Sequence, residues 1–194
     1  MPATSQHPPA SYLDTAAGTF STLNLGLDGR LLKAVARLGF VYPTLVQSQT
    51  IPLGLAGRDL LIRARTGSGK TAAYGLVLLQ KLLEMKSTPA STAVTPVSTA
   101  GPRVFAVVLV PTRELVEQTA KALTELAYYA TDVVRVVSLG GGGSLAEQAA
   151  SLGRGADVVV GTPAKVLAHI AAGSLDAAVS TWSLSPPHIP LPPP

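Results

Sequence analysis

The sequence predicts an α/β fold built on a parallel sheet flanked by helices. Short apolar runs alternate with longer stretches of helical spacing, and several of the runs are rich in valine, as buried parallel strands are. A glycine-rich turn also stands between one such run and a helix. The 194 residues are enough for one domain with a real core, and 47% hydrophobic against 13% charged residues indicates a mostly globular chain.

The front of the chain predicts a flexible lead followed by helices. Residues 1–19 are polar and contain prolines, so we expect them to be a flexible lead. Apolar residues recur at helical spacing from residue 31 to 38, which predicts a helix that stops near Gly39. The next expected elements are a helix from about residue 44 to 55, a strand at 59–64 (DLLIRA) and a helix at 72–85.

The second half predicts alternating strands and helices. Residues 87–103 are rich in Ser, Thr, Pro and Ala without any period, so we expect a disordered surface insertion. Strands are then expected at 104–110, 133–137 and 157–160, and helices at 114–129, at 144–152 and after residue 163. The proline cluster at 185–194 admits neither element. It is either a polyproline recognition segment or, as we favour, part of an unrelated tail over 177–194.

The composition excludes several classes of site. The chain has no cysteine, and therefore no disulfide, thiolate nucleophile or zinc–thiolate site. No apolar run approaches the roughly 20 residues that span a bilayer, and the N-terminus lacks the regions of a secretory signal, so we expect a soluble intracellular protein without membrane contact. The net charge of +4 suits either a polyanionic partner or simple solubility. The histidines suggest no metal site, and His169 is expected to be structural or exposed.

Residues 64–71 (ARTGSGKT) match the P-loop pattern with alanine in place of its first glycine. Gly67 and Gly69 would let the backbone turn so that N–H groups face phosphate oxygens, and the helix starting near Lys70 adds the positive end of its dipole. Lys70 would reach the β- and γ-phosphates, and Thr71 would ligate Mg²⁺. An ordinary glycine turn is the alternative, but the position between a strand and a helix favours phosphate binding.

Five motifs, in order, resemble those of DEAD-box RNA helicases. The first is the Q motif, which Phe20, Gly39-Phe40, Pro43-Thr44 and Gln47 resemble. The second is the P-loop at residues 64–71, since that family's P-loop usually begins with alanine. The other three are Pro111–Leu115, Gly141-Gly142 with Gln148, and Gly161–Lys165. The resemblance covers about residues 20–176 and implies a partial N-terminal RecA-like domain. The stretches LGLDGRLLKAVARLGF, LLIRARTGSGKTAAY and DVVVGTPAKVLAHI are most similar to a nucleolar subfamily that assembles the large ribosomal subunit.

The resemblance implies an ATP site. Gln47 would hydrogen-bond the adenine edge, and either Phe20 or Phe40 would pack beside the base or belong to the core. The other implied ATP-binding residues are Ala64, Arg65, Thr66, Gly67, Ser68, Gly69, Lys70 and Thr71. Lys70 and Thr71 would act in catalysis by positioning the phosphates and Mg²⁺, which Thr71 would hold together with the nucleotide.

The resemblance also implies a surface that contacts RNA phosphates without reading sequence. Its residues would be Pro111, Thr112, Arg113, Gly141, Gly142, Thr162, Pro163 and Lys165. Lys165 stands where the family usually has arginine, which keeps the charge but loses bidentate geometry, so we expect weaker contact there. Arg113 and Glu114 could instead be a solvated helix start. The implied setting is pre-ribosomal particles in the nucleus or nucleolus.

The family's Asp-Glu-Ala-Asp motif, which holds Mg²⁺ and positions the attacking water, does not occur in these residues, and neither does a second RecA-like domain. We therefore expect the chain to bind ATP and RNA weakly without hydrolysis, whereas an intact form would be an RNA helicase. The alternatives are a non-catalytic or regulatory binding product and a fragment without function. A nucleotide kinase is disfavoured, since it would not need residues 111–115. The 60–62 strand would present an unpaired apolar edge and make the chain marginally stable.

Overall fold

The computed structural model describes residues 8–87 and 104–176, together with the backbone of residues 182–184. The chain divides into two compact units. The first comprises Met1–Thr88 with Ala122–Val134, and the second comprises Pro89–Lys121 with Arg135–Pro194. From residue 88 on, the expected insertion lies outside the described residues, and so does the proline cluster at 185–194.

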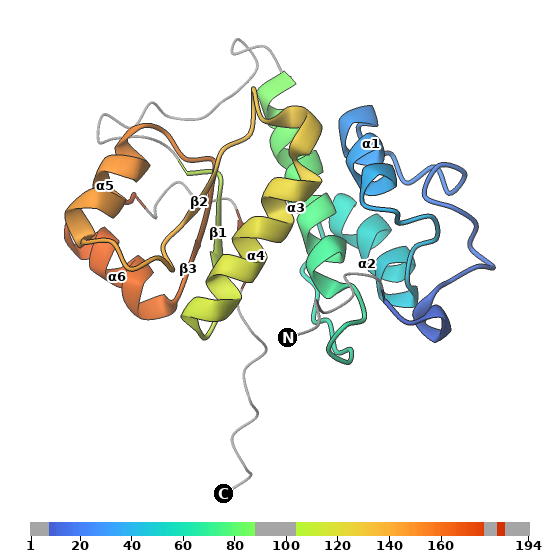
Figure 1. Ribbon diagram of the computed structural model, residues 1–194. Helices are drawn as coiled ribbons and strands as arrows, with labels where there is room; N and C mark the ends of the chain where they lie inside the picture. The colour runs from blue at the N-terminus through green and yellow to red at the C-terminus, as the bar shows by residue number, and fades with distance from the viewer. Residues whose placement is uncertain (1–7, 88–103, 177–181, 185–194) are drawn as a thin grey trace, which may run out of the picture. The chain divides into compact units, whose positions relative to one another are not determined.

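The described residues of the first unit form helices and connecting segments (Figure 1). Its elements are η1 (Ala10–Tyr12), α1 (Gly29–Arg37), α2 (Leu45–Leu55), α3 (Lys70–Ser87), the end of α4 (Arg113–Leu126) and η2 (Tyr128–Ala130). The predicted face of α1 buries Leu31 and Val35. α2 and α3 pack so closely that a Cβ added to Gly54 would lie 2.8 Å from Cγ1 of Val77. A glycine at this position therefore sets how near the two helices come.

Four hydrogen bonds, two at Asp28 and two at Asp14, fix the front of this unit. The Asp28 carboxylate caps α1 by accepting from the Arg30 N–H at 2.8 Å, and the Asp28 N–H donates to Oε1 of the buried Gln80 on α3 at 2.6 Å. Nearer the N-terminus, the Asp14 N–H donates to the Pro43 carbonyl at 2.8 Å, and the Asp14 carboxylate accepts from the Ser48 hydroxyl at 2.6 Å. The described part of the segment expected to be a flexible lead thus bonds to the start of α2.

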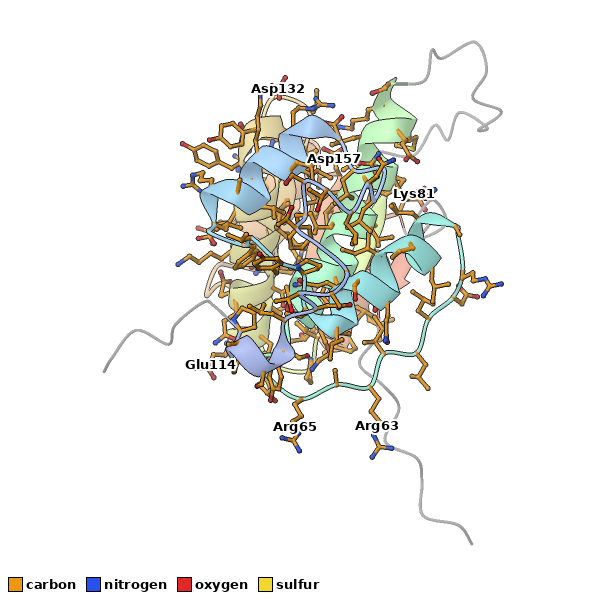
Figure 2. All side chains as sticks on the ribbon, turned by 90° about the vertical axis from the view of Figure 1, so that its right-hand side faces the viewer. Arg63, Arg65, Lys81, Glu114, Asp132 and Asp157 are labelled. Carbon is orange, nitrogen blue, oxygen red and sulfur yellow. The ribbon has the colours of Figure 1, made fainter. Side chains whose placement is uncertain are left out.

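The predicted strand at 59–64 is wrong. This segment runs without regular structure from the end of α2 to the glycine-rich turn, and its backbone joins no described strand. Leu61 is 85% exposed, and the neighbouring Arg63 points outward (Figure 2). A strand forms only where a second strand satisfies its N–H and C=O groups, and the described residues of this unit offer none.

The second unit contains the predicted parallel sheet, which is confirmed with helices beside it (Figure 1). The strands are β1 (Ala106–Leu109), β2 (Val136–Ser138), β3 (Val158–Gly161) and β4 (Trp182–Leu184), in the order β2-β3-β1-β4. The helices α5 (Leu145–Gly153) and α6 (Pro163–Ala171) lie together on one side of the sheet. All pairings are parallel, with Val159 opposite both Val107 and Val137.

Alternation along the strands builds the core of this unit. Val107, Val137 and Val159 share one face and are buried with Leu152 of α5 and Val166 of α6. Their neighbours in sequence turn to the other face, as the two-residue period of a strand requires. The valine-rich runs of the sequence are therefore strands of the sheet, and β3 and β1 are its two central ones.

The fourth strand lies inside the stretch that we expected to be an unrelated tail. β4 pairs in parallel with β1, so that Ser183 stands opposite Val107. In the described part of the chain, no helix has the length and apolar character needed to cross a lipid bilayer.

Candidate functional site

The glycine-rich turn immediately before α3 depends on its glycines. Gly67 and Gly69 have φ of +79° and +84°, a conformation that other L-residues rarely adopt. A Cβ on Gly69 would also lie 2.5 Å from Nε2 of Gln47, well inside contact distance. Only glycine satisfies both the conformation and the space at this position.

Gln47 ties the start of α2 to this turn. Its Oε1 accepts from the Thr44 N–H at 2.8 Å, which completes a capping box, and its Nε2 donates to the Gly69 carbonyl at 3.1 Å. The side chain is 3% exposed. One N–H and one lone pair of the amide keep bonding capacity. The structure therefore brings Gln47 to the loop, and its contact with adenine stays a prediction.

Lys70 is the first residue of the 18-residue helix α3 and folds back over the turn. Its Nζ donates to two carbonyl oxygens, that of Ala64 at 2.6 Å and that of Arg65 at 2.7 Å. Partial burial lowers the pKa of Lys70, because desolvation penalises its charged form. The ammonium group is thus held at the helix N-terminus by oxygens that belong to the turn itself.

Ser68 supplies an independent sign of an anion site. Its side chain is 8% exposed, and its Oγ is buried without a hydrogen-bond partner among the described residues. A buried hydroxyl without a partner costs about 1–3 kcal/mol, so such groups are rare in folded proteins. An orphaned hydroxyl, a cation and the N-terminus of α3 suit the oxygens of a polyphosphate.

The remaining predicted ATP residues are distributed around this turn. Thr71 is half-buried in the first turn of α3, whereas Arg65 and Thr66 are exposed, and Arg65 points outward (Figure 2). Phe20 is 4% exposed and belongs to the core, and Phe40 is half-buried. Among the described residues no three His, Cys, Asp or Glu side chains gather to hold a metal ion, and the Mg²⁺ role of Thr71 stays a prediction.

The three predicted RNA motifs lie at one edge of the sheet in the second unit. Pro111–Arg113 follows β1, Gly140–Gly143 follows β2, and Thr162-Pro163 follows β3. Because β2, β3 and β1 are parallel neighbours, their carboxyl ends meet at the same edge. The N-termini of α4, α5 and α6 start there and carry partial positive charge. The topology therefore gathers residues that the sequence separates by about fifty positions.

These motifs differ in how their polar groups are occupied. Thr112 caps α4, since its Oγ1 accepts from the Leu115 N–H at 3.3 Å. Thr162 starts α6 without a side-chain cap bond. Pro111, Thr112 and Arg113 are exposed, and Lys165 is half-buried. The hydroxyl of Thr162 and the cations of this edge are thus available to an anionic ligand.

The loop Gly140–Gly143, called the glycine loop below, is held at its start by side chains that the sequence analysis missed. The Ser138 hydroxyl donates to Oε1 of Glu117 at 2.7 Å and accepts from the Gly140 N–H at 3.1 Å. At the other end, Ser144 and Glu147 form a capping box for α5, and the backbone N–H of Ser144 lowers the pKa of the Glu147 carboxyl. The capping box is readable as S-x-x-E in the sequence, but nothing in the sequence pairs Ser138 with Glu117.

His169 is buried rather than exposed. Its side chain is 0% exposed, and its ring nitrogens face Ser174 and Gln148. Burial lowers the pKa of His169, and the nearby charge of Lys165 lowers it further. The open choice between a structural and an exposed histidine is therefore decided in favour of a buried, hydrogen-bonded one.

The comparison with known families matches this architecture. A family model described as "DEAD/DEAH box helicase" matches residues 44–183, which contain the glycine-rich turn and all three motif loops of the sheet edge.

The chain belongs to the DEAD/DEAH box helicase family.

Curated relatives in this family share about two fifths of their residues with the chain over the matched region. "Probable ATP-dependent RNA helicase ddx56" of Dictyostelium discoideum is 44% identical over 147 residues, covering 76% of this chain and 20% of its own length. "ATP-dependent RNA helicase dbp9" of Botryotinia fuckeliana is 40% identical over 177 residues, covering 91% of this chain and 26% of its own length. The chain thus spans a fifth to a quarter of these relatives.

Solved structures in the family share the fold. A DEAD box protein from the hyperthermophile Methanococcus jannaschii superposes with a TM-score of 0.69 at 30% identity, covering 86% of this chain and 40% of that one. The RNA helicase Prp28 from Chaetomium thermophilum bound to ADP gives a TM-score of 0.66 at 35% identity, covering 82% and 36%. The expected RecA-like fold and the DEAD-box resemblance are both confirmed.

Proposed function

We propose that the chain provides the ATP-binding and RNA-contacting portion of an ATP-dependent RNA helicase. The observation that carries the proposal is the turn before α3, where Lys70 and the orphaned hydroxyl of Ser68 meet at a helix N-terminus. These groups fit a polyphosphate in charge and in bonding capacity. The names of the curated relatives, which are ATP-dependent RNA helicases, support the same function.

In this proposal the turn binds Mg·ATP. The phosphate oxygens take the place of the two carbonyl oxygens that Lys70 now contacts. Ser68 donates to a phosphate oxygen, and the Thr71 hydroxyl ligates the Mg²⁺ that accompanies the nucleotide. Gln47 recognises the adenine edge through the remaining capacity of its amide, and Phe40 packs beside the base.

The edge formed by the carboxyl ends of the strands contacts RNA phosphates in this proposal. Exposed Arg113 and half-buried Lys165 supply charge, and the uncapped Thr162 hydroxyl supplies a hydrogen bond. Backbone N–H groups of the glycine loop add contacts that do not depend on base identity. Binding of this kind is independent of sequence and weakens steeply with salt.

We further propose that the 194 residues bind Mg·ATP and RNA without efficient hydrolysis. No two of the eleven acidic residues are adjacent in sequence, so no Asp-Glu pair is present to hold Mg²⁺ and position water. Duplex unwinding would belong to a longer form, and the three stretches quoted above favour pre-ribosomal particles as its setting. A regulatory binding product of the same site remains the alternative function.

Calorimetric titration with Mg·ATP tests the nucleotide proposal. Lys70→Ala should raise the dissociation constant about 10- to 100-fold, because one charge-assisted contact of about 1.5–3 kcal/mol is lost. Lys81→Ala is the matched control, since it removes the same charge from the same helix near the Glu84 side chain. Equal affinities for wild type and Lys70→Ala would refute the site. RNA-dependent phosphate release that Lys70→Ala abolishes would refute the absence of hydrolysis.

Fluorescence anisotropy with a labelled single-stranded RNA tests the sheet edge. Arg113→Ala should weaken binding and reduce the salt dependence by about one phosphate contact. Arg58→Ala is the control, because Arg58 is an exposed arginine of the first unit that the proposal does not use. Identical affinity and salt slope for wild type and Arg113→Ala would refute a role of this edge in RNA binding.

A further inference from the structure

A chain of buried hydrogen bonds connects α6 to the exposed glycine loop. His169 Nδ1 lies 2.8 Å from the Ser174 hydroxyl, and His169 Nε2 lies 3.1 Å from Oε1 of Gln148. Gln148, 7% exposed on α5, then donates from Nε2 to the Gly141 carbonyl at 3.2 Å. Two hydrogen bonds thus connect a fully buried imidazole to a loop whose residues Gly141–Gly143 are exposed.

The acceptor at the end of this chain fixes every donor before it. The Gly141 carbonyl can only accept, so the Gln148 amide must present its nitrogen to Gly141 and its oxygen to the imidazole. The Nε2 of His169 must then carry the hydrogen. In the neutral ring Nδ1 is then an acceptor that faces the Ser174 hydroxyl, which also lies 3.2 Å from the His169 carbonyl oxygen. Burial lowers the pKa of His169, which keeps this neutral form in place at pH 7.

The consequence reaches the next peptide group. In a planar trans peptide the C=O and the following N–H point in opposite directions. Because the Gly141 carbonyl points inward to Gln148, the Gly142 N–H must point away from the protein. Gly142 is exposed, and a Cβ added to it would have no atom of the described residues within 4 Å. A donor aimed into open space beside a helix N-terminus suits an anionic oxygen.

We propose that His169 is a positioning residue that acts through Gln148 to orient the Gly141–Gly142 peptide, so that the Gly142 N–H donates to a phosphate of bound RNA. The proposal rests on the RNA-contacting role given above to this edge of the sheet. Glycine has the largest backbone freedom of any residue, so a loop of four glycines would sample many peptide orientations without such a restraint. Ser138 accepts from the Gly140 N–H at the start of the loop, and the His169–Gln148 pair holds the carbonyl of Gly141.

The test combines three variants with a surface control. Gln148→Met keeps the volume and removes both bonds, and His169→Leu removes the donor. His169→Gln retains an N–H that can reach Gln148. Leu167→Ala is the matched control, since Leu167 belongs to the same helix and is 64% exposed. Each chain is examined by ¹H–¹⁵N spectroscopy of the glycine amides and by anisotropy with a labelled oligouridylate.

The expected result separates positioning from stability. Gln148→Met and His169→Leu should shift the Gly142 amide resonance and weaken oligouridylate binding about 10- to 100-fold, as for one lost hydrogen bond to a charged group. The salt slope should stay at the wild-type value, because a backbone N–H neutralises no phosphate. His169→Gln and Leu167→Ala should bind within about twofold of wild type.

Distinct outcomes would overturn distinct steps. A His169 ring that carries its hydrogen on Nδ1 in the wild-type ¹⁵N spectrum would overturn the orientation argument without any variant. An unchanged Gly142 amide in Gln148→Met would overturn the positioning role. A shifted amide with unchanged RNA affinity would overturn its purpose while leaving the RNA edge intact. A wild-type chain that binds no oligouridylate at low salt would overturn the proposed RNA surface itself.

Discussion

Replacing Gly69 by alanine tests whether Gln47 holds the glycine-rich turn before α3. Gly57 provides a matched control in the same unit, since its φ of +77° resembles the +84° of Gly69. An alanine in this left-handed region costs about 1–2 kcal/mol at either position. A Cβ at Gly57 meets nothing within 4 Å, so the conformational cost should be its whole effect.

At Gly69 the same methyl group meets a second obstacle. Its Cβ would lie 2.5 Å from Nε2 of Gln47 and 3.3 Å from Oγ1 of Thr44. Gln47 must move away, which breaks its bond to Gly69, worth about 1 kcal/mol, and disturbs a capping box worth about 1 kcal/mol more. Gly69→Ala should therefore destabilise the chain by about 2 kcal/mol more than Gly57→Ala, or about 4–8 °C in melting temperature.

Urea and thermal unfolding of five chains measure this coupling: wild type, Gly57→Ala, Gly69→Ala, Gln47→Ala and the variant that combines Gln47→Ala with Gly69→Ala. In a Gln47→Ala background the methyl group of Gly69→Ala no longer meets an amide, so its effect should fall to that of Gly57→Ala. Mg·ATP affinity should fall in Gly69→Ala and stay at the wild-type value in Gly57→Ala. Equal destabilisation by Gly69→Ala with and without Gln47 would show that the two residues do not act on each other.

Three further predictions follow from contacts in the two units. Gly54→Ala should destabilise the chain by about 1–3 kcal/mol, because its Cβ would lie 2.8 Å from Val77, and denaturant midpoints that equal wild type would contradict this. Gly140→Ala should cost a similar amount, because its Cβ would lie 2.8 Å from Cγ1 and 2.9 Å from Cβ of Val116 on α4, whereas Gly141→Ala, with open space around it, should unfold like wild type. Stability should also fall below pH 6.5, since the pKa of His169 is lowered in the folded chain and the unfolded chain then binds the proton more readily. The contribution of neutral His169 to the free energy of unfolding is complete above pH 6.5 and is lost towards acid at up to about 1.4 kcal/mol per pH unit. His169→Gln should therefore flatten the plot of melting temperature against pH between about pH 5 and 7. Parallel plots for wild type and His169→Gln would contradict the assignment.

The elements that were predicted well are those whose signal is local. The valine runs at β1 and β3 and the spacing of α1 each report their own burial within a few residues. The glycine-rich turn was recognisable for the same reason, since the conformation required at Gly67 and Gly69 calls for glycine in the sequence itself.

The elements that failed depend on partners elsewhere in the chain. Residues 59–64 have the apolar composition of a strand, but composition does not say whether a second strand is present to pair with them. The bond from Gln47 to Gly69 joins residues 22 positions apart, and that from His169 to Gln148 joins residues 21 apart. No local pattern encodes such contacts, so the supports of both sites became visible only in three dimensions.

Residues 59–64, the segment between α2 and the glycine-rich turn that pairs with no described strand, have a consequence for proteolysis. A serine protease binds its substrate as an extended strand and needs free backbone N–H and C=O groups on both sides of the scissile bond. Residues 59–64 lie outside every described strand. Arg63 within this segment is exposed, and so are Arg58 and Arg65 on either side of it. Trypsin-like enzymes, which cleave after basic residues, therefore find their recognition residue and their preferred backbone geometry in the same place. The chain therefore presents accessible tryptic sites immediately before the loop to which we assign its nucleotide chemistry.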